Sequence, residues 1–98
     1  MHVLFTRIAR WELEDAVRYY ELEYSGLGRR FKGEVGKAAV RIAEYPQSWS
    51  MERGDVRKCL LHKFPYKLMY SVEEEPILVI AVAHQHRNPA YWVARDKT

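Results

Sequence analysis

Apolar residues recur at helical spacing through the first half of the chain. The first set follows Thr6 at positions i, i+4, i+7, i+8, i+11 and i+15: Ala9, Leu13, Ala16, Val17, Tyr20 and Tyr24. This spacing places the set on one face of an amphipathic helix. We expect the helix to end at Ser25 and Gly26, because glycine tolerates the left-handed conformation that closes a helix.

A second set with the same periodicity begins a few residues later. It consists of Phe31, Val35, Ala38, Ala39, Ile42 and Tyr45. Pro46 ends this second predicted helix, because proline lacks a backbone N–H and disfavours the helical conformation of the preceding residue. Two helices joined by so short a connection are expected to form an antiparallel hairpin.

The hydrophobic period changes to two after the polar residues 47–54, which we interpret as a loop. Strands are predicted at residues 56–61, 66–72 and 77–83, where β-branched and aromatic residues are frequent. Their short connections predict antiparallel hairpins. Residues 1–5 are a further apolar run that we expect to join the sheet. The prediction is an α+β fold of order β-α-α-β-β-β, in which a helical hairpin packs on a small antiparallel sheet.

The middle predicted strand has two different faces. Tyr66, Leu68, Tyr70 and Val72 share one of them, and Lys67, Met69 and Ser71 share the other. We expect one face of the sheet to contact the helices and the other to meet water or a partner.

Composition is that of a single folded domain over residues 1–98. The chain is 48% hydrophobic and 30% charged, which suits a globular core and differs from the pattern of disordered chains. Its longest apolar run, residues 77–83, is far too short to span a membrane. The N-terminal residues lack a signal-peptide pattern, so we expect a cytoplasmic protein. A single cysteine, Cys59, excludes an internal disulfide and any zinc site built on paired cysteines.

The positive charge is concentrated toward the C-terminal end. The net charge is +3, and residues 55–98 carry most of the excess once the acidic run 73–75 is set aside. This part also contains three of the four histidines. An anionic partner would therefore meet the C-terminal portion, although a solvated sheet face explains the same charges.

Local motifs give little support for cofactor or metal chemistry. The chain has no phosphate-binding or dinucleotide-binding fingerprint, so no cofactor is expected. His84 and His86 lie two residues apart, and a metal would need a third ligand such as His62, so we expect no metal site. A strand-end histidine forms hydrogen bonds or acts as a general acid or base, and the sequence leaves this choice open.

Gly33-Glu34-Val35-Gly36 matches the GxxG loop of one RNA-binding module. The four residues lie within the second helical stripe and lack turn chemistry, so we reject that function. Close helix packing is the expected reason for the two glycines.

The most specific pattern lies in the last third of the chain. It comprises Phe64-Pro65-Tyr66, Tyr70, Ile80-Ala81-Val82-Ala83-His84, Arg87-x-Pro89-x-Tyr91-Trp92 and Arg95. With Arg57 and the stripe Leu13-x-x-Ala16-x-x-Tyr19-Tyr20, it resembles the RelE/ParE superfamily of toxins from bacterial type II toxin–antitoxin modules. The resemblance extends over nearly the whole chain, and its strongest part is His84-x-x-Arg87-x-Pro89-x-Tyr91-Trp92.

The resemblance implies a fold, a partner and one of two activities. Members of this superfamily pack two helices on a small antiparallel sheet, and an antitoxin whose C-terminal segment wraps the toxin neutralises them. RelE-like toxins cleave messenger RNA on the ribosome. ParE-like toxins, which include plasmid stabilisation proteins, bind DNA gyrase and trap its cleavage complex.

RNA cleavage requires activation of the ribose 2′-OH, stabilisation of the phosphorane charge and protonation of the leaving oxygen. The resemblance to RelE-like enzymes assigns these tasks to Lys58, Lys67 and Tyr91. Other nucleases of the family use a histidine near the C-terminus, which implies His84 or His86 as a further acid or base. Leu60 and Gln85 occupy two positions where those enzymes carry cations. Loss of a cation aimed at developing charge costs about 10²- to 10³-fold in rate, which argues against this activity.

The leading hypothesis from the sequence is therefore ParE-like inhibition of DNA gyrase. The expected target-binding residues are Arg57, Lys67, His84, Arg87, Tyr91 and Trp92. Trp11, Tyr19 and Leu22 lie off the apolar stripe of the first helix, and we expect an antitoxin to cover them in a toxin–antitoxin hetero-oligomer. The alternatives are ribosome-dependent mRNA cleavage and an inactive homologue that binds only its antitoxin.

Overall fold

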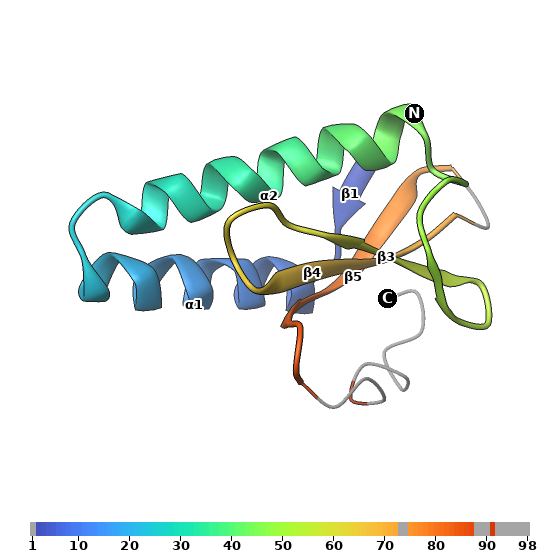
Figure 1. Ribbon diagram of the computed structural model, residues 1–98. Coiled ribbons are helices and arrows are strands. Elements are labelled where there is room, and N and C mark those ends of the chain that lie inside the picture. Colours follow the sequence, from blue (N-terminus) through green and yellow to red (C-terminus); the bar gives the residue numbers. More distant parts are fainter. Residues whose placement is uncertain (1, 73–74, 88–90, 92–98) are drawn as a thin grey trace.

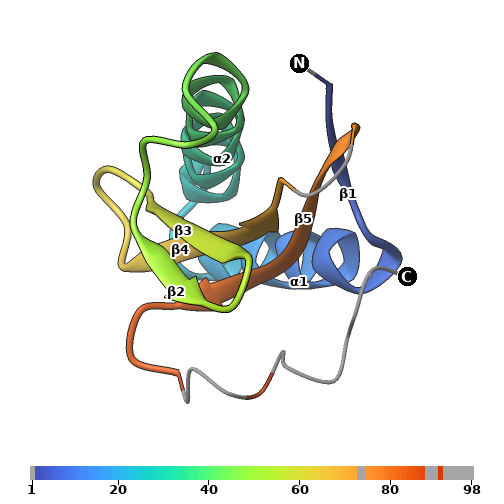
Figure 2. The ribbon, with the colours of Figure 1, turned by 90° about the vertical axis from the view of Figure 1, so that its right-hand side faces the viewer.

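The computed structural model describes residues 2–72, 75–87 and 91. Within these residues, two helices cover one face of a five-stranded sheet (Figures 1 and 2). The elements in chain order are β1 (Val3–Phe5), α1 (Arg7–Glu23), α2 (Leu27–Glu44), β2 (Met51–Arg53), β3 (Val56–Leu60), β4 (Tyr66–Ser71) and β5 (Ile77–His84). No helix in the described part of the chain is both long and apolar enough to cross a bilayer.

Local capping interactions define the ends of the helical hairpin. The Thr6 hydroxyl accepts a hydrogen bond from the Ala9 N–H at 3.2 Å and so caps α1. Gly26, with φ of 88°, starts α2 in the left-handed conformation that glycine adopts without strain. The Glu21 carboxylate accepts hydrogen bonds from the N–H groups of Gly26 and Gly28, at 2.9 and 3.0 Å. One side chain of α1 therefore caps the start of α2.

The sheet confirms the predicted fold and adds two details. Its strand order is β1-β5-β4-β3-β2. The predicted meander of three strands is present and antiparallel, but β1 pairs with β5 in parallel, so the sheet is mixed rather than wholly antiparallel. Parallel neighbours need a long connection, which the chain between these two strands supplies.

The expected loop at residues 47–54 contains the short edge strand β2. Met51 and Arg53 pair with β3, with a register irregularity between them. Only three residues long and largely exposed, β2 has no apolar alternation by which the sequence could reveal it.

The main core lies between the helices and the sheet. Its fully buried members include Phe31 and Ile42 of α2 and Leu68, Tyr70 and Val79 of the sheet. The helical stripes predicted from the sequence are confirmed except at their ends, where Tyr24 and Tyr45 are exposed.

An aromatic cluster occupies the end of the core under the β3–β4 connection. It consists of Tyr20, Phe31, Phe64 and Tyr66, whose interacting ring centroids are 5.0 to 6.0 Å apart. Contacts of this kind contribute about 0.5–1.5 kcal/mol per pair beyond the buried area. The cluster joins the turn end of the helical hairpin to the β3–β4 end of the sheet.

The two faces of β4 alternate as predicted. Leu68 and Tyr70 face the helices, whereas Met69 lies on the outer face with Val56, Ile80 and Ala81. Tyr91 packs against this smaller outer cluster. The outer face of the sheet is therefore partly apolar and carries part of the C-terminal portion of the chain.

The expectation for Gly33 and Gly36 is wrong. A Cβ atom at either residue would have no heavy atom within 4 Å, so neither glycine is needed for helix packing. The close approach is instead at Gly28, where a Cβ would lie 2.5 Å from the Val17 carbonyl oxygen of α1. The apolar stripe of α2 did not indicate the contact at Gly28, because this residue lies at the start of α2, before the first residue of the stripe.

Replacement of Gly28 by alanine should force the two helices apart. We expect Gly28→Ala to lower the free energy of unfolding by about 1–3 kcal/mol, as overpacking does in close-packed interiors. The matched variant Gly36→Ala should raise it by about 0.5–1 kcal/mol, because alanine is the better residue inside a helix. Urea unfolding followed by circular dichroism measures both. Equal effects of the two variants would contradict the contact.

Hydrogen bonds from the sheet hold the connection between α2 and β2, and Trp49 Nε1 of this connection donates to the Arg41 carbonyl of α2 at 3.3 Å. The Tyr70 hydroxyl donates to the Pro46 carbonyl at 2.8 Å. Arg57 donates to the Trp49 carbonyl at 2.8 Å and to Gln47 Oε1 at 3.2 Å. Burial raises the pKa of Tyr70 to about 12, although the nearby Arg57 opposes the shift.

The raised pKa of Tyr70 predicts a loss of stability in alkali. The unfolded chain ionises this phenol near pH 10 and the folded chain only near pH 12, so the contribution is complete below pH 10 and is lost as pH rises to 12. Urea unfolding at pH 8 and pH 11 should show that Tyr70→Phe loses about 1 kcal/mol less than the wild type over this interval. The same loss in both proteins would contradict the assignment.

Candidate functional site

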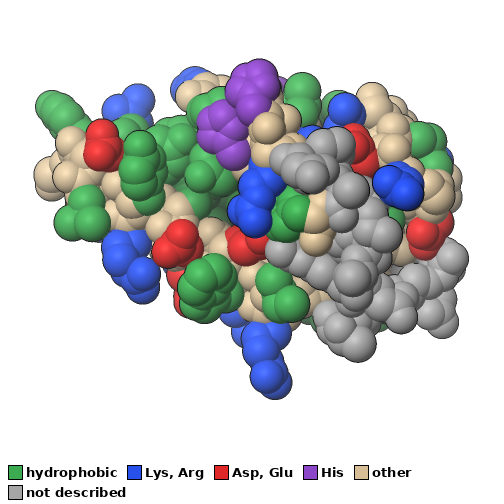
Figure 3. Space-filling model, turned by 90° about the horizontal axis from the view of Figure 1, so that it is seen from below, with side chains coloured by type: hydrophobic (Ala, Val, Ile, Leu, Met, Phe, Trp, Pro, Cys, Tyr) green, Lys and Arg blue, Asp and Glu red, His purple; other side chains and the backbone are tan. Residues whose placement is uncertain are grey.

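A groove runs beside α1 at the C-terminal end of β5. Two adjoining hollows of about 250 and 440 Å³ form it, and both are lined by Asp15, Ala16, Tyr66 and His84. On the face seen from below, histidine side chains lie beside basic, acidic and apolar ones (Figure 3). The groove therefore combines apolar contact area with side chains of both charges.

The exposed face of α1 forms one wall of this groove. Trp11, Tyr19 and Leu22 are 65%, 56% and 82% exposed. Their spacing of eight and three residues places them on one side of the helix, away from the core stripe. Trp11 lines the smaller hollow and Tyr19 the larger one. The sequence prediction that an antitoxin covers these three residues stays a prediction, and they do share one surface.

His84 lies at the floor of the groove. Its Nδ1 accepts a hydrogen bond from the His86 N–H at 3.2 Å, which puts the proton of the neutral imidazole on Nε2. The His84 ring is 5.5 Å from the ring of Tyr66, its partner across the strands. Burial raises the pKa of Tyr66, so its phenol stays neutral at physiological pH. Among the described residues, no three His, Cys, Asp or Glu side chains are grouped closely enough to hold a metal ion.

A chain of contacts joins the groove to the C-terminal portion of the chain. The Arg87 guanidinium lies 4.0 Å from the centre of the Tyr91 ring, a cation–π geometry. The Tyr91 hydroxyl donates to Glu12 Oε2 at 3.0 Å. The other oxygen of Glu12 accepts a hydrogen bond from the Val82 N–H at 2.9 Å. One carboxylate of α1 therefore fixes both Tyr91 and an N–H of β5 that no neighbouring strand binds.

Glu12 was not among the site residues predicted from the sequence. It lies among the polar positions of α1, and its two partners are 70 and 79 residues away along the chain. No local pattern encodes such a contact. Its position is set by β1, which pairs with β5 only up to Val79 and leaves the rest of that strand edge to α1.

Loss of the Glu12 carboxylate should free the edge of β5. We expect Glu12→Ala to lower the free energy of unfolding by about 1–3 kcal/mol, because it leaves a backbone donor without its charged acceptor. Hydrogen exchange measured by NMR should be faster at the Val82 amide. Glu14→Ala, an exposed position on the same helix, is the control and should change neither quantity. Unchanged exchange at Val82 in the Glu12 variant would contradict the contact.

The two lysines that the sequence predicted as site residues lie on the outer face of the sheet. Lys67 pairs with Ala83 across the strands, and its neighbours Tyr66 and Leu68 face the helices. It is only 6% exposed, and its ammonium has no hydrogen-bond or ion-pair partner within the described residues. Lys58 lies on the same face and forms an ion pair with Glu52 at 3.3 Å.

The structure divides the predicted target-binding residues. His84 and Arg87 both line the groove, and Tyr91 lies beside them through its cation–π contact with Arg87. Lys67 lies at the same end of the sheet but on the opposite face. Arg57 faces the helices, where its hydrogen bonds hold the connection before β2. Trp92 lies outside the described residues.

The residues predicted for RNA cleavage do not converge on one point. Lys58 and the buried Lys67 lie on the outer face, whereas His84 faces the groove on the other side. The Tyr91 hydroxyl is engaged by Glu12. General acid–base catalysis requires these groups within hydrogen-bond reach of one phosphate. Within the described residues, these groups therefore do not form one acid–base set.

Two helices on one face of a five-stranded mixed sheet, with Tyr91 packed on the outer face, define the RelE/ParE toxin fold. The solved structure described as "Chromosomal ParDE TA system from P. aeruginosa" matches with a TM-score of 0.65 and 17% identity, covering 86% of this chain and 95% of that chain. At this identity the likeness establishes the fold alone.

The family follows from the sequence itself. A model of the family described as "ParE toxin of type II toxin-antitoxin system, parDE" matches residues 3–89. The match spans most of the chain, and the protein therefore belongs to the ParE toxin family. A search of curated protein sequences finds no match.

Proposed function

We propose that this protein is the toxic partner of a two-protein module, that it inhibits DNA gyrase in the cytoplasm, and that a cognate antitoxin neutralises it. The observation that supports the proposal most strongly is the match to the ParE toxin family over residues 3–89. Inhibition by binding also agrees with a site whose cation, imidazole and aromatic rings lie together without forming a catalytic set.

The proposed target-binding surface is the end of the groove around Arg87. This guanidinium is exposed, stacks on Tyr91 and lines the same hollow as His84. Arginine held over an aromatic ring is pre-organised for contact with a partner, and such residues frequently dominate the binding energy of interfaces. The exposed face of α1 is the proposed antitoxin surface, because Trp11 and Tyr19 offer large apolar rings beside the groove.

The gyrase proposal is tested by adding purified protein to a DNA supercoiling reaction. We expect the wild type to inhibit supercoiling and Arg87→Ala to need at least about tenfold more protein, the loss typical of a hot-spot residue. Arg29→Ala, which removes an exposed cation of α2, should inhibit as the wild type does.

A different outcome identifies the alternatives. Codon-linked breaks found by primer extension on translated messages, without inhibition of gyrase, would contradict gyrase inhibition and indicate an mRNA endonuclease. Failure to inhibit gyrase, to cleave messages and to arrest growth would indicate a homologue that only binds its antitoxin.

A further inference from the structure

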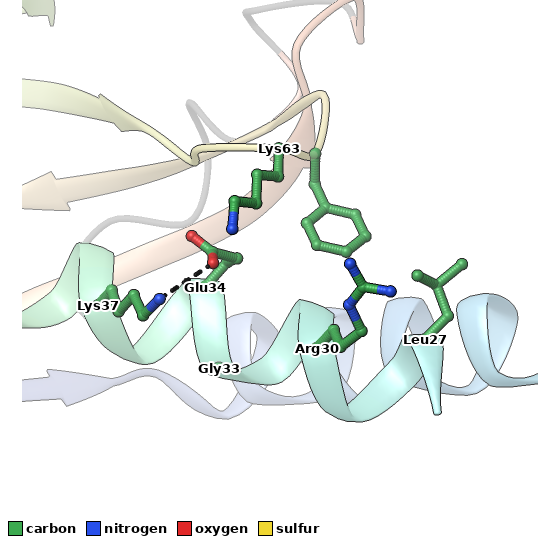
Figure 4. Close-up of a pocket in the computed structure, with 7 residues that line it drawn as sticks. Leu27, Arg30, Gly33, Glu34, Lys37 and Lys63 are labelled. Atoms are coloured by element: carbon green, nitrogen blue, oxygen red, sulfur yellow. Dashed lines mark hydrogen bonds and ion pairs between the residues drawn. The ribbon is translucent and has the colours of Figure 1, made fainter. Parts of the chain in front are cut away.

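A separate hollow lies on the other side of the β3–β4 connection from the groove. It has a volume of about 390 Å³ and is bordered by three cations: Arg30 and Lys37 of α2, and Lys63 of the connection (Figure 4). Gly33 lies in its wall, and a Cβ atom there would meet nothing within 4 Å, so the space stays open. Neither the groove nor the proposed gyrase contact uses any of these residues.

The charges in this hollow are only partly compensated. Glu34 is 6% exposed, and its Oε2 accepts a hydrogen bond from Lys37 Nζ at 3.3 Å. Arg30 and Lys63 have no hydrogen-bond or ion-pair partner among the residues that the structure describes. Three cations face one carboxylate, so the hollow keeps an excess of positive charge, with Lys63 directed toward it from above in Figure 4.

The backbone of Lys63 is strained. Its φ is 72°, and it is the one non-glycine residue with positive φ in the described part of the chain. The other positive-φ positions there, Gly26 and Gly54, are glycines, which adopt this conformation without strain. A lysine at such a position destabilises the fold relative to glycine, and what it adds is an exposed ammonium over the hollow.

The surroundings favour an acidic peptide over a nucleic acid. Leu27 and Phe64 form the apolar side of the hollow, and the Phe64 ring packs against Tyr20 and Phe31 with centroids 5.0 and 5.2 Å away. This ring is part of the core cluster and is not free to stack on a base, as single-strand binding requires. Carboxylate side chains of a peptide can instead pair individually with Arg30 and Lys63.

We propose that this hollow is a docking site for an acidic segment of a partner protein, whose carboxylates pair with Arg30 and Lys63. A lysine occupies this strained position, where glycine would be unstrained, because the lysine charge is needed for the contact. The site is separate from the α1 groove and does not depend on gyrase inhibition.

The test separates the charge of Lys63 from its strain. The probe is a fluorescein-labelled peptide of alternating Glu and Leu, followed by fluorescence anisotropy at low salt. Lys63→Gly should weaken binding about three- to tenfold and also raise the unfolding temperature by roughly 2–6 °C, because glycine relieves the strain. Lys63→Arg should keep the affinity, and Arg29→Ala, a cation outside the hollow, is the control.

Each outcome decides the proposal. Weaker peptide binding by a more stable Lys63→Gly variant supports it, since damage to the fold cannot explain that combination. Equal affinity of wild type and Lys63→Gly, or equal loss in Arg29→Ala, would overturn it. Displacement of the peptide by inorganic phosphate or by a thymidine oligonucleotide at lower concentration than by unlabelled peptide would overturn the choice of an acidic peptide.

Discussion

The packing of the helical hairpin on one face of the sheet determines which side of each helix stays exposed. The aromatic cluster of Tyr20, Phe31, Phe64 and Tyr66 fixes the hairpin against the β3–β4 end of the sheet. Because the apolar stripe of α1 packs in the core, the opposite side of this helix faces solvent. The groove forms where that exposed side meets the end of β5. A single-layer helical hairpin cannot bury both sides of α1, so the exposed aromatic rings are available for a partner.

Glu12 links this packing to the proposed target-binding residues. Its carboxylate accepts hydrogen bonds from the Val82 N–H at the edge of β5 and from the Tyr91 hydroxyl. The Arg87 guanidinium in turn stacks on the Tyr91 ring. The groove on α1 and the cation at the end of β5 thus belong to one connected set of contacts. A partner that binds in the groove lies beside the carboxylate that positions Tyr91, which gives an antitoxin direct access to the residues of the proposed toxic surface.

The sequence predicted those features that depend on local periodicity. The helical stripes defined α1 and α2, and the alternation in β4 correctly separated Leu68 and Tyr70 from Met69. The parallel partner of β1 and the short strand β2 were not predictable, because pairing between distant segments leaves no periodic signal.

The candidate site was less predictable than the fold for the same reason. The sequence placed Lys67 and His84 in one set, but the register pairs His84 with Tyr66 and Lys67 with Ala83, so the two side chains lie on opposite faces. The roles of Gly28 and Lys63 were likewise not predictable from the sequence pattern. Gly28 acts through a close contact with the Val17 carbonyl oxygen, and Lys63 is distinguished by its backbone conformation.

The role of the exposed face of α1 is tested most directly by the affinity of the chain for a cognate antitoxin, measured by calorimetry with surface variants. If the exposed face of α1 is the antitoxin surface, Trp11→Ala should weaken binding by at least about tenfold, as loss of a buried aromatic anchor does. Tyr45→Ala, which removes an exposed ring at the end of α2, should bind as the wild type does. Unchanged affinity of Trp11→Ala, or an equal loss in both variants, would contradict the account.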